Sequence, residues 1–379
     1  MNHLGNWRNG ELGNFITLKR GFDLPQQKRE DGQVPIFSSS GITGTHSTAM
    51  VNAPGVITGR YGTIGEVFYA AEDFWPLNTT LFVEDFHGND AKFIYYFLKT
   101  LEWSKFTSAS AVPGINRNTV HKETVSLPDI ETQRRIASTL SMLDEKIKTN
   151  TEINDNLEQQ AQALYKAWFV DLIPYNRVMP SDWFNGTVDD LAKEIICGKT
   201  PSTKIPEYYG GDIPFITIPD MHGKIYTIST ERCLSTYGAN TQAKKTLPKN
   251  AICVSCIGTA GLVTLVASKS QTNQQINSII PKDNFSPYYI YLLMQTLSEV
   301  INKLGQGGST IVNLSKAQFG KIKVCIPSVA TMRGFDEIVA PLFTMILKNQ
   351  KEIIRLSSLR DTLLPKLMSG ELDVSAVQL

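Results

Sequence analysis

A regular spacing of apolar positions marks two long stretches of the chain. From Ile136 onward, apolar or Asn residues recur at alternating spacings of four and three, as in a helix that buries one seam against another helix. The pattern returns 199 positions later, with Arg360 as the one departure. The seam positions are Ile136, Leu140, Leu143, Ile147, Asn150, Asn154, Leu157, Ala161, Leu164 and Trp168, then Phe335, Val339, Leu342, Ile346, Asn349, Ile353, Leu356, Arg360, Leu363 and Leu367.

The matched register predicts that the two helices pair with each other. Each follows a strand-like run that ends in proline, at Pro128 and at Pro327. Two such helices of one chain can pair antiparallel, with a globular segment at each end. Asn150 and Asn349 occupy equivalent positions, and a polar residue in an apolar seam fixes register at a cost in stability. We expect these two residues to face each other, and we expect a kink or break at Pro341.

The globular segments that precede the helices also repeat. Val56–Gly65 aligns with Ile252–Gly261, so that both segments contain a Gly-Thr turn between two strand-like runs. The sequence therefore predicts an α+β fold: two mixed α/β domains in tandem, each followed by a long helix, with the helices paired as an antiparallel coiled coil. The predicted boundaries are 1–128 for the first domain, 129–172 for the first helix, 173–327 for the second domain, 328–372 for the second helix and 373–379 for a tail.

Composition narrows the class of protein. No apolar run reaches the roughly eighteen residues of a membrane span, and the N-terminus lacks the basic and apolar regions of an export signal. Five cysteines without a regular framework fit a reduced cytoplasm. The net charge is −1 for residues 1–128 and +5 for residues 173–327. If the chain binds DNA, partners are expected to supply much of the phosphate contact.

Catalytic and metal motifs are incomplete. Gly198-Lys199-Thr200 resembles the end of a phosphate-binding loop, but the glycine that the motif requires five residues earlier is Lys193. Cys253 and Cys256 have no second ligand pair for zinc, and the histidines have no metal-like spacing. We expect no catalytic residue, metal or cofactor in this chain.

Several short stretches, taken in order and twice over, resemble the specificity subunit of type I restriction-modification enzymes. They are Arg20 through Pro25, Gly32 through Gly41, Gly59 through Gly65, Pro113 through Arg117, Pro128 through Ala137, Gly198 through Ser202, Tyr208 through Pro214 and Leu359 through Leu372. The departures are Met332, where the first repeat has Gln133, and Pro341, where it has Met142.

The resemblance implies a non-catalytic subunit that reads double-stranded DNA. Each globular segment would be a target recognition domain for one half of a split, asymmetric site, and the paired helices would set the spacing. The helices would also bind two methyltransferase subunits, which would carry S-adenosylmethionine and flip out an adenine in each half-site. Motor and nuclease subunits would add to that core.

Residues that differ between the repeats within shared loops are the candidates for DNA contact. Arg60-Tyr61 aligns with Cys256-Ile257 in otherwise matching turns, and arginine can grip guanine in the major groove or clamp phosphate. An exposed loop arginine without a role is the alternative. The candidates in the first half are Ser38, Ser39, Ser40, Thr43, Arg60, Tyr61, Thr63, Asn116 and Arg117.

The second half offers a basic and aromatic set. Its lysines are better placed for phosphates than for bases, and its tyrosines are as well suited to the core as to DNA. The candidates are Lys204, Tyr208, Tyr209, Lys244, Lys245, Ser255, Thr259, Ser309, Thr310, Asn313 and Lys316.

Two other functions fit parts of the sequence. One is a stand-alone DNA-binding adaptor that pairs with no methyltransferase, which copurification would distinguish. The other is a fused modification enzyme with a degenerate motif, which S-adenosylmethionine binding by the isolated chain would support.

Overall fold

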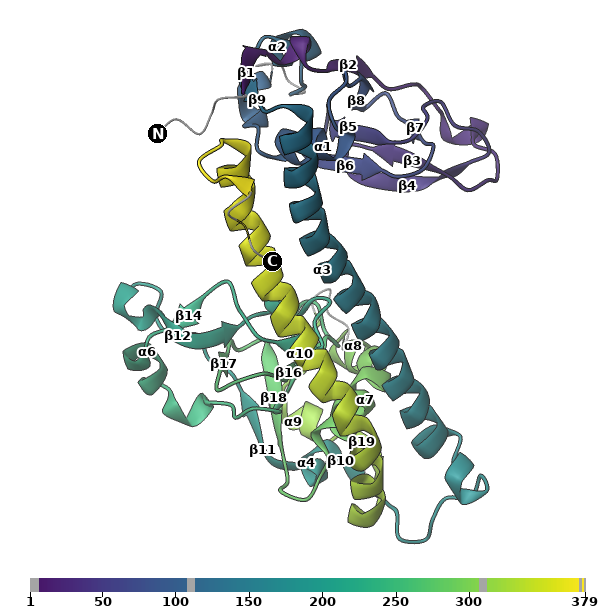
Figure 1. The fold of residues 1–379 in the computed structure, drawn as a ribbon. Helices are drawn as coiled ribbons and strands as arrows, with labels where there is room; N and C mark the ends of the chain where they lie inside the picture. The colour runs from purple at the N-terminus through teal and green to yellow at the C-terminus, as the bar shows by residue number, and fades with distance from the viewer. Residues whose placement is uncertain (1–6, 108–112, 307–311, 375–376, 378–379) are drawn as a thin grey trace. The chain divides into compact units, whose positions relative to one another are not determined.

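A computed structural model describes residues 7–107, 113–306, 312–374 and 377 of the chain. The chain forms two compact units (Figure 1). Unit 1 comprises Met1–Ile147 and Arg355–Leu379, and unit 2 comprises Lys148–Ile354. Each unit therefore contains part of both long helices, α3 (Ile130–Tyr165) and α10 (Val329–Met368).

Unit 1 is built on two small sheets. The larger has the antiparallel order β2-β8-β5-β6, and the smaller has the order β4-β3-β7. The strands are β1 (Arg8–Glu11), β2 (Thr17–Arg20), β3 (Val34–Ser38), β4 (Gly41–His46), β5 (Gly55–Gly59), β6 (Val67–Ala70), β7 (Trp75–Pro76), β8 (Thr80–Asp85) and β9 (Thr124–Leu127), and the short helices are α1 (Ala91–Lys99) and α2 (Arg117–His121). One core joins this domain to α3 through Ile136 and Leu140, and to α10 through Leu367 and Met368.

Unit 2 repeats the plan with a larger sheet, β11-β18-β15-β16-β13, and a second sheet, β14-β12-β17. The strands are β10 (Phe184–Thr187), β11 (Ala192–Cys197), β12 (Tyr209–Ile216), β13 (Tyr226–Thr227), β14 (Cys233–Leu234), β15 (Ile252–Ser255), β16 (Val263–Val266), β17 (Gln271–Thr272), β18 (Ile276–Pro281) and β19 (Lys323–Ile326). The short helices are α4 (Val188–Leu191), α5 (Ile218–Met221), α6 (Thr236–Asn240), α7 (Pro287–Thr296), α8 (Ser298–Gln306) and α9 (Lys316–Gly320). The core packs this domain against Ala161 and Tyr165 of α3 and Phe335 of α10.

The internal repeat is visible in the backbone. Helices α2 and α9 have equal lengths, and so do the strands β9 and β19 that follow them. The turn after β5 and the turn after β15 each place two glycines in the left-handed region, with φ of +77° and +85° at Gly62 and Gly65, and of +76° and +89° at Gly258 and Gly261. A side chain is disfavoured in that region. The predicted fold class, two α/β domains each followed by a long helix, is confirmed.

The seam residues are buried to different degrees. The buried ones are Ile136, Leu140, Leu143, Asn150, Asn154, Ala161, Phe335, Val339, Ile346, Asn349, Leu356 and Leu367, and the half-buried ones are Ile147, Leu157, Leu164, Trp168, Leu342, Ile353, Arg360 and Leu363. Helix α3 begins at Ile130 and changes to a π-helical turn at Lys166–Val170. Helix α10 ends at Met368, four residues before the predicted boundary.

The polar layer differs from its prediction. Within unit 2, Asn349 donates to Asn154 Oδ1 at 3.0 Å, whereas Asn150 donates to Glu352 Oε2 at 3.1 Å. In an antiparallel pair related by a pseudo-two-fold axis, a residue faces its own repeat equivalent only if it lies on the axis. Within unit 2, Asn349 faces Asn154, one turn beyond its own repeat equivalent Asn150. The expectation that Asn150 and Asn349 face each other is therefore wrong.

Helix α10 runs without a break through Pro341, so the predicted break is absent. Because proline has no N–H, the carbonyl of Glu337 loses its helical hydrogen bond. Pro341 and Glu337 are both exposed, so water can donate to that carbonyl. Two residues after Pro341, Phe343 is fully buried, whereas the seam residue Leu342 is half-buried. The Phe343 ring stacks on Tyr288 of α7, with centroids 4.5 Å apart. Helix α10 thus buries a wider face than a two-helix seam.

Arg360 has a specific partner in unit 1. Its Nη1 donates to Asp144 Oδ1 at 2.8 Å, and the other oxygen of Asp144 accepts from Tyr96 at 2.5 Å. The repeat equivalents of Asp144 and Arg360 are Phe343 and Ala161, both apolar and buried. The ion pair therefore distinguishes the unit 1 part of the helix pair from the unit 2 part.

In the described part of the chain, no helix is long and apolar enough to cross a membrane.

The Asn154–Asn349 contact leads to a stability prediction. Asn349→Leu should lower the free energy of unfolding by about 1–3 kcal/mol, because it leaves a buried amide unpaired. The double variant Asn154→Leu/Asn349→Leu should recover much of that loss. Urea unfolding of the four proteins in this double-mutant cycle measures the coupling, and strictly additive losses would refute the pairing.

Candidate nucleic-acid interface

A surface hollow of about 430 Å³ lies in unit 1, where three separated segments meet. Arg20 reaches it from the end of β2, and Arg60 and Tyr61 reach it from the turn after β5. Asn116 and Arg117 come from the start of α2. We call these five residues the arginine hollow. Four of them belong to the predicted DNA-binding set; Arg20 does not, although it begins one of the stretches that carried the family resemblance.

Backbone contacts hold the Arg60–Tyr61 segment. The amides of Arg60 and Tyr61 both donate to the carbonyl of Thr79, at 2.9 and 3.2 Å, and the Arg60 carbonyl accepts from Ile115 at 3.0 Å. The Arg60 guanidinium lies over the Tyr61 ring, 4.5 Å from its centroid. A Cβ at Gly114 would lie 2.2 Å from that ring, so glycine is what allows Tyr61 to rest there. The arrangement fixes the direction of the Arg60 side chain.

The charges in the hollow are largely uncompensated. Arg20 lies 3.8 Å from Asp23, in an exposed pair that is worth little. Within the described residues, Arg60 and Arg117 form no ion pair. Among the described residues, the hollow therefore presents two guanidinium groups without an ion-pair partner and one that is weakly paired.

The serine loop lies beside this turn. Ser38 hydrogen-bonds to Ser40 at 3.0 Å and to the Gly41 carbonyl at 3.1 Å, which shapes the hairpin between β3 and β4. Ser39 approaches the turn, since a Cβ at Gly62 would lie 3.2 Å from its Oγ. Thr43 and Thr63 are exposed. Ser39 thus borders the turn that carries Arg60, and none of these five residues is among those that line the hollow.

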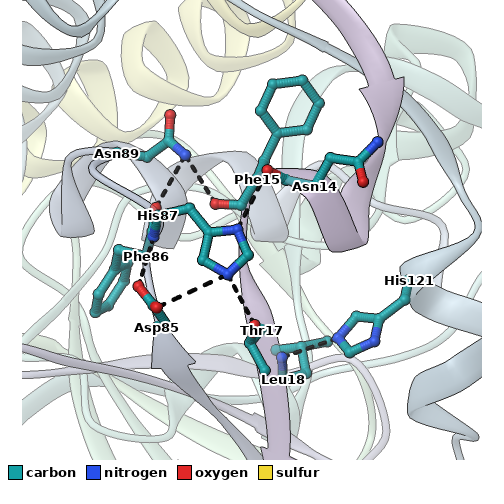
Figure 2. A network of polar contacts seen from close by, with 9 residues as sticks. All are labelled: Asn14, Phe15, Thr17, Leu18, Asp85, Phe86, His87, Asn89 and His121. Carbon is teal, nitrogen blue, oxygen red and sulfur yellow. Dashed lines mark hydrogen bonds and ion pairs between the residues drawn. The ribbon is translucent and has the colours of Figure 1, made fainter.

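A polar network holds β2 and α2, the two elements that end or begin at Arg20 and Arg117 (Figure 2). His121, the last residue of α2, accepts a hydrogen bond from the Leu18 amide at its Nε2, at 2.9 Å. His87 contacts Thr17 Oγ1 at 2.9 Å and the Asn14 carbonyl at 3.2 Å. Two histidines thus hold adjacent residues of the strand that ends at Arg20. Sequence reasoning missed both, because isolated histidines carry no signal of the backbone they contact.

The equivalent site in unit 2 keeps the backbone and changes the side chains. The bridge between Ile257 and Asn313 matches the one between Tyr61 and Gly114, and Leu314 donates to the Cys256 carbonyl at 2.9 Å as Ile115 does to Arg60. Cys256 takes the place of Arg60 there. Burial raises the pKa of the Cys256 thiol to about 11, so it is neutral. Lys316, at the start of α9, corresponds to Arg117, while Asn313 and Thr259 are exposed.

Two candidates in unit 2 have structural roles. Ser255 is fully buried, and its Oγ accepts the Leu262 amide at 2.9 Å, so its prediction as a DNA contact is wrong. Ser255 is the last residue of β15, and its side chain is buried against the turn that follows the strand. The half-buried Tyr209 donates its hydroxyl to the Pro201 carbonyl at 2.8 Å, which ties down the adjoining loop.

The other predicted basic contacts of unit 2 are three lysines. Lys204 and Lys244 are exposed and Lys245 is half-buried. Tyr208 packs against the exposed Tyr237, with ring centroids 5.3 Å apart. Ser309 and Thr310 lie outside the described residues. Among the described residues, no group of three or more His, Cys, Asp or Glu side chains could hold a metal ion.

Comparison with known proteins identifies the family that has this repeated architecture. A family model described as "Type I restriction modification DNA specificity domain" matches the chain twice, over residues 5–159 and 180–357. The chain belongs to this family. The two matches correspond to the two copies of an α/β domain followed by a long helix.

Curated members of the specificity-subunit family are similar over most of their length. The type I restriction enzyme HindI specificity subunit of Haemophilus influenzae is 34% identical over 72% of this chain and 75% of its own. The MjaIX specificity subunit of Methanocaldococcus jannaschii is 26% identical over 76% of this chain and 70% of its own. The crystal structure of the type I restriction-modification S subunit from M. genitalium shares the fold, with a TM-score of 0.71 and 19% identity over 97% of both chains.

The network in Figure 2 leads to a pH prediction. Burial, with Arg117 and His87 nearby, lowers the pKa of His121 below 6.5. The unfolded chain then binds the proton more readily, so this contribution to stability is fully present above about pH 6.5 and is lost as the pH falls toward the folded-state pKa. His121→Gln, whose amide oxygen can accept the same hydrogen bond, should flatten that pH dependence. Urea unfolding between pH 7.5 and 5 measures it, with the exposed His222→Gln as the control. An unchanged slope in His121→Gln would contradict the assignment.

Proposed function

We propose that the chain is the non-catalytic specificity subunit of a type I restriction-modification complex and reads a split, asymmetric site in double-stranded DNA. The observation that carries this proposal is the arginine hollow and its counterpart. The same turn and helix start occur in both units, but Arg60-Tyr61 in one is Cys256-Ile257 in the other. A shared scaffold with different loop side chains suits two domains that recognise different sequences.

The paired helices support a spacing role. Helix α3 has 36 residues, which at 1.5 Å per residue is about 54 Å. Two recognition domains held apart by such a helix would contact half-sites more than one DNA turn of about 34 Å apart, with unread base pairs between them. The exposed faces of the helices would bind two methyltransferase subunits, which would supply S-adenosylmethionine, and motor and nuclease subunits would join that complex in the cytoplasm.

Methylation mapping tests the proposal. The chain is co-expressed with its genomic neighbours, and methylated adenines are mapped in host DNA. A single split motif that is methylated only in the presence of this chain is the expected result. Unchanged methylation, together with DNA binding by the purified chain alone, would favour a stand-alone adaptor.

A domain exchange then shows which domain recognises which half of the motif. Replacing residues 1–128 with those of a related chain should change one half of the motif and leave the other half and the spacer unchanged. The reciprocal exchange of residues 173–327 is the matched control, and it should change only the other half. A change in both halves after either exchange would contradict independent recognition by the two domains.

A further inference from the structure

We infer that the arginine hollow of unit 1 binds a phosphodiester group of the DNA backbone rather than a base edge, with Arg20, Arg60 and Arg117 as its cationic contacts. The inference rests on the proposed function, because it names the part of the DNA that this site takes. It adds Arg20 to the DNA-contacting residues and chooses between the two roles open to Arg60.

Charge is the first argument. Three guanidinium groups line one hollow, and among the described residues only Arg20 forms an ion pair, 3.8 Å from Asp23. Like charges gathered in one concave surface repel, and a bound anion relieves that repulsion. A base edge is neutral and engages a single arginine through two hydrogen bonds. A phosphodiester is anionic and offers oxygens to several donors at once.

Shape is the second argument. Base edges lie at the floor of a groove, so an arginine that reads them must project from the protein surface. Arg60 instead lies against Tyr61, which rests on Gly114 in the wall of the hollow. Phosphates protrude from the duplex and can enter such a recess. The stacked guanidinium is also held in place before binding, so less side-chain entropy is lost when the anion is bound.

The repeat supplies the third argument. Gly21 in unit 1 and Gly198 in unit 2 make the same close approach to neighbouring carbonyls, so the preceding residues, Arg20 and Cys197, are equivalent. The unit 2 turn folds with Cys197, Cys256 and Ile257 where unit 1 has Arg20, Arg60 and Tyr61. The backbone of the site therefore forms without the two arginines of these segments. Their presence in unit 1 needs a ligand rather than a folding role to explain it.

The salt dependence of DNA binding tests the inference. The assembled complex with its methyltransferase is titrated with a duplex carrying the mapped motif at several KCl concentrations. The slope of log affinity against log salt falls by about 0.9 for each phosphate contact removed. Arg60→Gln and Arg117→Gln should each lower the slope by about that amount and leave the methylated motif unchanged. The control is Lys193→Gln in unit 2, outside the hollow, whose ammonium lies 3.2 Å from Asp283, and it should leave the slope unchanged.

A set of duplexes with single neutral methylphosphonates locates the contact. One position in one half-site should weaken binding of the wild-type complex and have a much smaller effect on Arg60→Gln. An unchanged slope in both variants, or a relaxed base preference at one motif position, would overturn the inference in favour of no contact or base reading. Failure of the wild-type complex to bind the motif would instead count against the proposed function, so the two failures are distinguishable.

Discussion

Phe335→Ala should lower the free energy of unfolding of unit 2 by about 3–5 kcal/mol, the usual cost of removing a fully buried phenylalanine ring. Phe335 has no exposed surface, and its ring lies 5.8 Å from that of Trp168 and 4.9 Å from that of Phe169. Its loss opens a cavity where α3, α10 and the second domain meet. Because one or two kcal/mol is a large fraction of the stability of a typical domain, partial unfolding of unit 2 is expected near physiological temperature.

Urea unfolding with hydrogen exchange resolved by peptide measures both the size and the place of this effect. Protection against hydrogen exchange should fall in peptides of unit 2. It should change least in the sheet β2-β8-β5-β6 of unit 1. Ile338→Ala, on the same helix but 45% exposed, is the matched control and should cost less than about 1 kcal/mol. Equal losses in the two variants would show that the aromatic cluster is not the stabilising contact of this helix pair.

The same helix shows how far periodicity alone can be taken. A spacing of four and three predicts which residues of one helix can share a face, and Phe335, Val339, Ile346 and Asn349 are indeed buried. It cannot predict a second neighbour on the next face. Phe343 is buried because Tyr288 of α7 packs there, a contact between residues 55 positions apart in sequence. The heptad pattern contains no information about that contact.

Symmetry was the other source of error. Equivalence along the sequence predicted that Asn150 faces Asn349. In the structure, Asn154 lies opposite Asn349 instead. Which side chains of the two helices lie opposite each other depends on how both helices pack within a unit, which a single sequence does not reveal. At the hollow, comparison of the repeats singled out Arg60, and Arg117 lies in a stretch that carries the family resemblance; both stay predicted DNA contacts, and the structure places them in one hollow. The sequence does not predict that Arg20 lies beside Arg60, because Arg20 is forty positions earlier and reaches the hollow only through the pairing of β2, β8 and β5.

The turn that carries Arg60 depends on a glycine at its base, and Gly59→Ala is expected to disrupt it. A Cβ there would lie 1.9 Å from the Thr63 carbonyl oxygen, a backbone atom of the same turn. Relief requires the turn to open, which should cost about 3 kcal/mol and displace Arg60 and Tyr61 together. Urea unfolding measures the cost, and the salt slope of DNA binding should fall by at least as much as in Arg60→Gln.

Gly88→Ala is the matched control for this substitution. Gly88 also lies in a turn of unit 1, with φ of +81°, but nothing lies within 4 Å of its Cβ position. The left-handed backbone alone should cost about 1–2 kcal/mol and leave DNA binding unchanged. The repeat makes the contrast sharper, because the residue equivalent to Gly59 is Ser255, whose side chain hydrogen-bonds within its own turn. Unit 2 thus accommodates a side chain at the position where unit 1 excludes one. If Gly59→Ala cost no more than Gly88→Ala and kept the wild-type salt slope, the turn after β5 would not be what positions Arg60.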